Sequence, residues 1–126
     1  MKAFRRSMDL CGAAAFRNYE FYVTVCKAPD NKPGEDVWLA YIPDLGIATE
    51  GYGREDAYDM ARDAGSMTLD LMKPWARPGC GRMYASEALQ ATKEAYPDID
   101  ISAWEFNPVQ MELPYTGWGN EVEEAE

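Results

Sequence analysis

The run Tyr-Ile-Pro-Asp-Leu-Gly-Ile-Ala-Thr-Glu-Gly at residues 41–51 constrains the fold more than any other part of this chain. Pro43 and Asp44 interrupt an apolar stretch, and Gly46 allows a close turn after which extended chain resumes. Proline, aspartate and glycine favour turns for different steric reasons, so their clustering is a strong turn signal. The pattern predicts a strand, a tight corner and a second strand, with a helix beginning soon after Gly51.

Three stretches of the N-terminal half have the composition of β-strands. Residues 19–27 alternate between apolar and polar side chains, residues 37–42 are apolar throughout, and residues 47–52 follow the corner. Aromatic and β-branched residues of this kind are enriched in strands. Because the connections between the three stretches are short, we expect an antiparallel three-stranded meander.

Residues 54–72 predict a long helix packed on this sheet. Apolar residues recur there at spacings of three and four, which marks the buried face of an amphipathic helix. These residues are Ala57, Met60 or Ala61, Ala64, Met67 and Leu71. Lys73 suits the negative end of the helix dipole, and Pro74 ends the helix. Gly65 costs about 1 kcal/mol against alanine and could mark close packing against the sheet.

The C-terminal half predicts an inserted second helix and a final edge strand. We expect Ser86 to cap the helix, which Pro97 closes. Residues 101–106 and 109–113 have an extended pattern, broken between them by Asn107-Pro108. Proline is tolerated on a sheet edge, so we place this last strand there. The predicted fold class is therefore α+β.

At 126 residues the chain is expected to form one domain, which we place at residues 19–113. Residues 1–18 are interpreted as an N-terminal leader that does not target the chain. Three irregularly spaced cysteines make a disulfide scaffold unexpected, so we expect a cytoplasmic protein. Residues 114–126 are expected to be a disordered acidic tail that leaves no room for a DNA-binding module. No apolar run approaches the roughly 20 residues that span a bilayer.

The net charge of −10 favours some partners and excludes others. Residues 1–18 carry four basic residues and one acidic one, so nearly all of the negative charge belongs to the rest of the chain. An acidic surface repels phosphate backbones, and we therefore expect no direct binding of nucleic acid. A basic protein partner is favoured, although acidity could also serve solubility alone.

Catalytic chemistry has little support in the residue types present. The chain has no histidine, so the usual general base is absent, and its three cysteines form no CxxC pair. Cys80 between two glycines is interpreted as an ordinary reduced thiol. A magnesium site built from Asp44, Glu50 and Asp70 is imaginable, but 22 acidic residues are better explained as a solvated surface.

Aromatic residues are numerous, at 13% of the chain, and core packing explains most of them. Tryptophan and tyrosine also dominate the binding energy of many protein interfaces. We therefore select Trp38, Tyr41, Glu50 and Tyr52, near the corner, as candidate contacts with a protein partner.

Residues 19–72 resemble the HicB family of type II antitoxins. The shared order is a strand ending in Pro-Asp-Leu, a glycine corner, a Thr-x-Gly step and a helix with an acidic-acidic-Ala start. The residues that carry this resemblance are Pro43, Asp44, Leu45, Gly46, Thr49, Gly51, Glu55, Asp56 and Ala57. The corner is apparently one residue shorter than in the family, and residues 74–100 look like an insertion.

The resemblance implies a partial ribonuclease-H-like fold without nuclease activity, cofactor or metal. It also implies a partner, a small basic RNA-cleaving toxin of HicA type, whose active site the antitoxin masks. Family members commonly self-associate, so a homo-oligomer, with a dimer as first expectation, is predicted. Two alternatives stay open: an orphan self-associating domain of this type, and a divalent-metal hydrolase or nuclease on the same fold.

Overall fold

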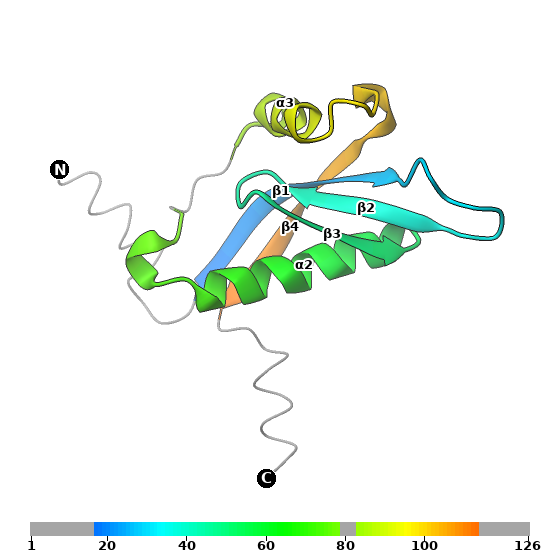
Figure 1. The fold of residues 1–126 in the computed structure, drawn as a ribbon. Helices are drawn as coiled ribbons and strands as arrows, with labels where there is room; N and C mark the ends of the chain where they lie inside the picture. The colour runs from blue at the N-terminus through cyan, green and yellow to red at the C-terminus, as the bar shows by residue number, and fades with distance from the viewer. Residues whose placement is uncertain (1–16, 79–82, 114–126) are drawn as a thin grey trace, which may run out of the picture.

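The computed structural model describes residues 17–78 and 83–113, which form a four-stranded antiparallel sheet with helices on its two faces (Figure 1). The strand order is β3-β2-β1-β4. The strands are β1 (Arg17–Lys27), β2 (Val37–Ile42), β3 (Ile47–Tyr52) and β4 (Glu105–Leu113). The helices are α2 (Arg54–Leu71) and α3 (Ala85–Ala95), with short 3-10 turns η1 (Pro74–Ala76) and η2 (Ile101–Ala103). The α+β class, the meander and the final edge strand are confirmed.

Some sequence-based expectations lie outside the described residues. They concern residues 1–16 of the predicted leader, the loop cysteine Cys80 and the predicted tail at 114–126. The last two residues of the predicted leader belong to β1, which begins at Arg17 and pairs there with Leu113 of β4.

The predicted corner is the loop that joins β2 to β3. The backbone N–H groups of Leu45 and Gly46 both donate to the carbonyl oxygen of Ile42, at 3.1 and 2.8 Å. Gly46 has φ +67°, a left-handed conformation that glycine adopts without steric cost. Asp44 accepts a hydrogen bond from the Met83 backbone at 3.1 Å, so the corner also holds the chain that leads into α3.

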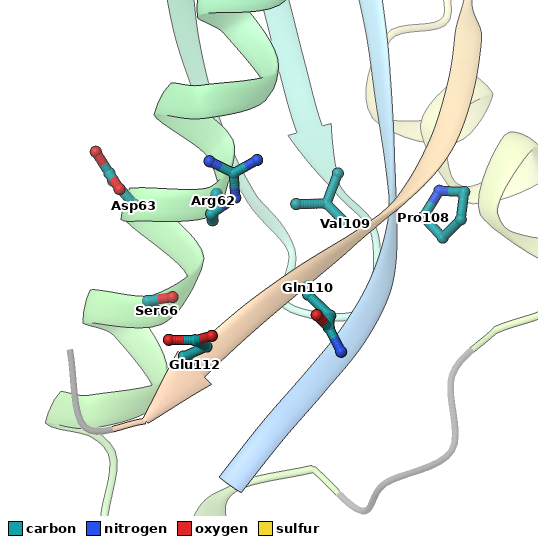
Figure 2. A pocket seen from close by; sticks show the side chains of 7 residues that line it. All are labelled: Arg62, Asp63, Ser66, Pro108, Val109, Gln110 and Glu112. Carbon is teal, nitrogen blue, oxygen red and sulfur yellow. The ribbon is translucent and has the colours of Figure 1, made fainter. Parts of the chain in front are cut away.

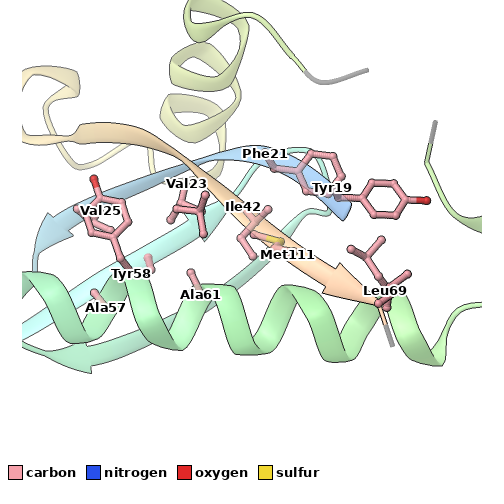
Figure 3. Close-up of a cluster of buried hydrophobic side chains, with 13 residues drawn as sticks. Tyr19, Phe21, Val23, Val25, Ile42, Ala57, Tyr58, Ala61, Leu69 and Met111 are labelled. Carbon is pink, nitrogen blue, oxygen red and sulfur yellow. The ribbon is translucent and has the colours of Figure 1, made fainter. Parts of the chain in front are cut away.

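A row of small residues brings α2 against the sheet. Ala57, Ala61 and Gly65 recur every four residues and are buried, as is Leu69 one turn later. A Cβ atom built on Gly65 would collide with the Met111 side chain, so the predicted close packing at this glycine is confirmed. Figure 3 shows Ala57, Ala61 and Leu69 on the side of α2 that faces the sheet, opposite strand side chains such as Val23, Ile42 and Met111.

The predicted buried stripe of α2 is partly wrong. Met60 and Met67 are 40% and 37% exposed, and Leu71 is 78% exposed. The row of small residues and the row of larger ones are both apolar, but only the small row allows the helix backbone to approach the sheet closely. The helix is therefore rotated so that Met60, Met67 and Leu71 lie outside the core, while Leu69 lies within it.

Both ends of α2 are held by hydrogen bonds between side chains and the backbone. At the start, the Asp56 carboxylate accepts a hydrogen bond from the Tyr52 backbone N–H at 2.9 Å. At the end, Arg77 donates to the carbonyl oxygen of Leu69 at 2.7 Å, so this arginine fills the role predicted for Lys73. Its charge complements the negative end of the helix dipole.

Helix α3 covers the face of the sheet opposite α2. The predicted cap at Ser86 is wrong, because the helix begins at Ala85 and Glu87 reaches back to accept the Tyr84 backbone N–H at 2.8 Å. Thr92 is fully buried and lies 2.9 Å from the Thr24 hydroxyl of β1. These two hydroxyls join the helix to the centre of the sheet.

The final strand differs from the predicted one in two ways. Residues 101–103 form η2 rather than a strand, because the Asp100 carboxylate accepts the Ser102 backbone N–H at 2.9 Å and starts a turn. β4 then runs without a break through Pro108, which pairs with Tyr22. A proline is compatible with an edge strand when its nitrogen faces away from the neighbouring strand.

Gly51 is required for close packing against α2 and not for a left-handed backbone conformation. Its φ is not positive; the left-handed glycine before α2 is Gly53, with φ +97°. A Cβ atom at Gly51 would instead lie 2.6 Å from the backbone nitrogen of Ala57. We predict that Gly51→Ala destabilises the domain by about 1–3 kcal/mol through overpacking. Urea unfolding measures this, with Ala48→Ser on the exposed side of β3 as the control, expected within about 0.5 kcal/mol of the parent.

The threonine pair predicts unequal effects of two matched substitutions. Thr92 donates its hydroxyl hydrogen to the Ala88 carbonyl at 2.7 Å, so Thr24 is the donor within the pair. Thr92→Val leaves the buried Thr24 hydroxyl with only a 3.5 Å contact to the Tyr41 carbonyl, and should cost about 1–3 kcal/mol. Thr24→Val leaves Thr92 paired and should cost less. Equal costs in thermal or urea unfolding would contradict this assignment.

Candidate partner-binding surface

The four candidate contacts predicted near the corner do not form one patch. Tyr41, Glu50 and Tyr52 share the face of the sheet opposite α2, where Tyr52 is 80% exposed and Glu50 is also exposed. Tyr41 is half-buried and packs edge-to-face on Tyr96, with ring centroids 5.8 Å apart. Trp38 faces the other way, packs against the core and donates to Asp36 at 2.9 Å.

Most of the residues that carry the family resemblance are buried or partly buried. Pro43 is buried in the corner, Leu45 packs partly against the core, and Ala57 is fully buried beneath Gly51. Thr49 lies half-buried on β3, opposite Ala40 of β2. Glu55 is exposed and accepts a hydrogen bond from Arg54 at 2.9 Å. Of this set, only Glu55 and Gly46 are exposed to a partner.

The three carboxylates considered for a magnesium site are dispersed. Asp44 lies in the corner, Glu50 points away from α2, and Asp70 lies near the end of α2. Among residues 17–78 and 83–113, no group of three or more His, Cys, Asp or Glu side chains could hold a metal ion. Asp44, Glu50 and Asp70 therefore do not come together as one site.

The outward side of α2 carries a row of acidic side chains. Their spacings of four and seven residues keep them on one side of a helix with 3.6 residues per turn. The row, here called the acidic row, consists of Glu55, Asp59, Asp63 and Asp70, all exposed. Arg54 pairs with Glu55 at 2.9 Å and Arg62 with Asp59 at 3.2 Å. Among the described residues, no ion pair neutralises the other two.

An exposed apolar strip runs beside the acidic row. It consists of Met60, Met67 and Leu71 of α2, which share one side of the helix, followed by Trp75 of η1, which is 79% exposed. Exposed apolar side chains gathered in this way commonly mark a protein interface. Hydrophobic periodicity alone predicts that the α2 members lie in the core. The repeat of small residues at 57, 61 and 65 is the sequence signal that could have identified this exposed side.

A groove of about 400 Å³ lies on the other flank of α2, against β4 (Figure 2). Its helix side is formed by Arg62, Asp63 and Ser66, and its strand side by Pro108, Val109, Gln110 and Glu112. Figure 2 shows the Ser66 and Glu112 side chains on the two sides of the gap that separates the helix from the strand. β4 forms the outer edge of the sheet at this groove.

A polar network joins α2 to the beginning of β4. Arg54 donates to Glu105 at 2.7 Å, and Asn107 donates to the Tyr58 hydroxyl at 2.9 Å. The Tyr58 hydroxyl in turn donates to Glu105 at 3.3 Å. Burial raises the pKa of Tyr58, so it stays a neutral donor, while the hydrogen bond to Glu105 raises the pKa of Arg54. The network fixes the position of the helix relative to the edge strand.

Among the described residues, no helix combines the length and the apolar character required to cross a bilayer. Comparison of the chain with protein-family models, curated proteins and solved structures finds no match. The resemblance to the HicB family therefore stays a prediction that rests on the residues of the corner and of the start of α2.

Proposed function

We propose that this chain is a HicB-like antitoxin domain that binds and neutralises a small basic RNA-cleaving toxin of HicA type in the cytoplasm. The observation that carries the proposal is the acidic row of α2 with the apolar strip beside it. A surface of this composition fits a partner that combines basic side chains with an apolar patch. The resemblance at residues 41–57 supports the choice of family and of the kind of partner.

The acidic row would act chiefly on the rate and specificity of association. Complementary charge accelerates encounter and rejects partners of like charge. Asp63 and Asp70 are well suited to this role because no ion pair in the described part of the chain engages them. A second copy of this chain docked through the same side would bring two acidic rows together, so a basic hetero-partner is favoured over self-association there.

The apolar strip would supply most of the binding free energy. A few residues dominate the binding free energy of most interfaces, and tryptophan is among those whose truncation most often costs about 2 kcal/mol or more. Leu71 and Trp75 are the most exposed members of the strip and have the most surface left to bury. Leu71 follows Asp70 directly and Trp75 lies in η1 just beyond, so charge and apolar area are both present near the C-terminal end of α2.

The test is rescue of growth during co-expression with the small basic ribonuclease encoded beside the gene of this chain. We expect the parent chain to restore growth and to co-purify with the toxin. Asp63→Lys with Asp70→Lys, and separately Leu71→Ser with Trp75→Ser, should abolish rescue. All four positions are exposed, so unfolding midpoints should stay close to that of the parent.

The matched control is Glu50→Lys with Tyr52→Ser on the opposite face of the sheet, which should still rescue growth. Loss of rescue in this control with retention in the α2 variants would place the interface at the corner and contradict the α2 assignment. Absence of a basic ribonuclease gene beside this one, together with no complex, would contradict the antitoxin function itself.

A further inference from the structure

We propose that the groove between α2 and the outer edge of β4 binds an extended, lysine- or arginine-bearing segment of a protein partner as a fifth strand of the sheet. This inference deepens the proposed function, because it states how one segment of a basic partner binds. It rests on that function for the identity of the partner and on the geometry of β4 for the mode of binding.

The edge of β4 has backbone groups available for such a strand. In the part of the chain that the structure describes, β4 pairs only with β1, through nine residues in register. Pro108 has no N–H to donate, so its position is one whose backbone points away from β1. Backbone direction alternates along a strand. Phe106, Gln110 and Glu112 therefore also direct their N–H and C=O groups outward, and an unpaired edge of this kind is a template for another strand.

Helix α2 gives the edge of β4 a second wall, so that the edge becomes one side of a groove. α2 lies alongside β4 and, with Arg62, Asp63 and Ser66, forms the second wall of the groove of about 400 Å³. Recognition of extended peptides by strand addition combines backbone hydrogen bonds, which give affinity, with contacts to alternate side chains, which give specificity. The network of Arg54, Tyr58 and Glu105 holds the helix and strand apart at a fixed spacing.

Charge selects the occupant. Asp63 and Glu112 lie on opposite walls of the groove, and its one cation, Arg62, already pairs with Asp59 at 3.2 Å. A segment with basic side chains at alternate positions would meet these carboxylates. A second copy of β4 would instead bring its own Glu112 and the acidic row of its α2 toward the same groove. Residues 114–126 contain four glutamates and no basic residue, so they also fit poorly.

The experiment titrates the full isotope-labelled chain with a seven-residue peptide of alternating lysine and valine, followed by amide chemical shifts. We expect the largest shifts at Phe106, Gln110 and Glu112, with saturable binding that weakens as salt is raised. The same peptide with glutamate in place of lysine should bind at least tenfold more weakly. Shifts confined to the apolar strip of α2, equal binding of both peptides, or no binding would overturn the inference.

Two edge variants test the backbone mode directly. Gln110→Pro removes one outward donor without touching the ladder to β1, and should weaken peptide binding about three- to tenfold. Pro108→Val adds an outward donor and should strengthen binding by a similar factor. If neither variant changes the affinity, strand addition is wrong. The two proposals can fail separately. If Gln110→Pro weakens binding of the lysine peptide, but the parent chain does not rescue growth when co-expressed with the toxin, the peptide site is supported and the antitoxin function is contradicted.

Discussion

The close approach of α2 to the sheet is the contact on which the rest of the structure depends. Ala57 and Gly65 leave no side chain large enough to separate helix and strand, and Gly51 meets the helix backbone itself. The space between the two backbones is then filled at the packing density of a protein interior. One added methyl group would therefore overlap neighbouring atoms. The same approach fixes which residues of α2 are left outside, and so creates the surface that we assign to a partner.

Local turn chemistry made the first half of the fold predictable. The corner, the meander and the extent of α2 follow from where proline, aspartate and glycine stand, because these residues act within a few positions of themselves. The rotation of α2 about its axis could not be predicted in this way. The helix has two apolar rows, and hydrophobic periodicity does not take the size of the side chains into account. Ala61 and Met60 look alike to a periodicity argument, yet only the alanine fits between helix and sheet.

The other differences have both local and long-range causes. η2 forms in place of a predicted strand because the Asp100 carboxylate accepts the backbone N–H of Ser102. Such a local hydrogen bond competes with strand formation, and the apolar pattern of the segment gives no sign of it. The corner residues were grouped by nearness in sequence, but neighbours along a strand point to opposite faces, which separates Trp38 from Tyr41. The groove beside β4 involves residues some fifty positions apart, and its existence depends on the order of the strands.

The tethering of η1 has a consequence for Trp75. Just after it, the Arg77 guanidinium binds the end of α2 and the Pro78 carbonyl accepts the Tyr19 hydroxyl at 3.1 Å. The chain that presents the indole is thus held between the end of α2 and these two contacts before any ligand arrives. Ordering a flexible loop upon association would subtract from affinity, and a preorganised aromatic side chain avoids much of that entropic loss. A complex formed there would owe its lifetime as much to this rigidity as to the area of the ring.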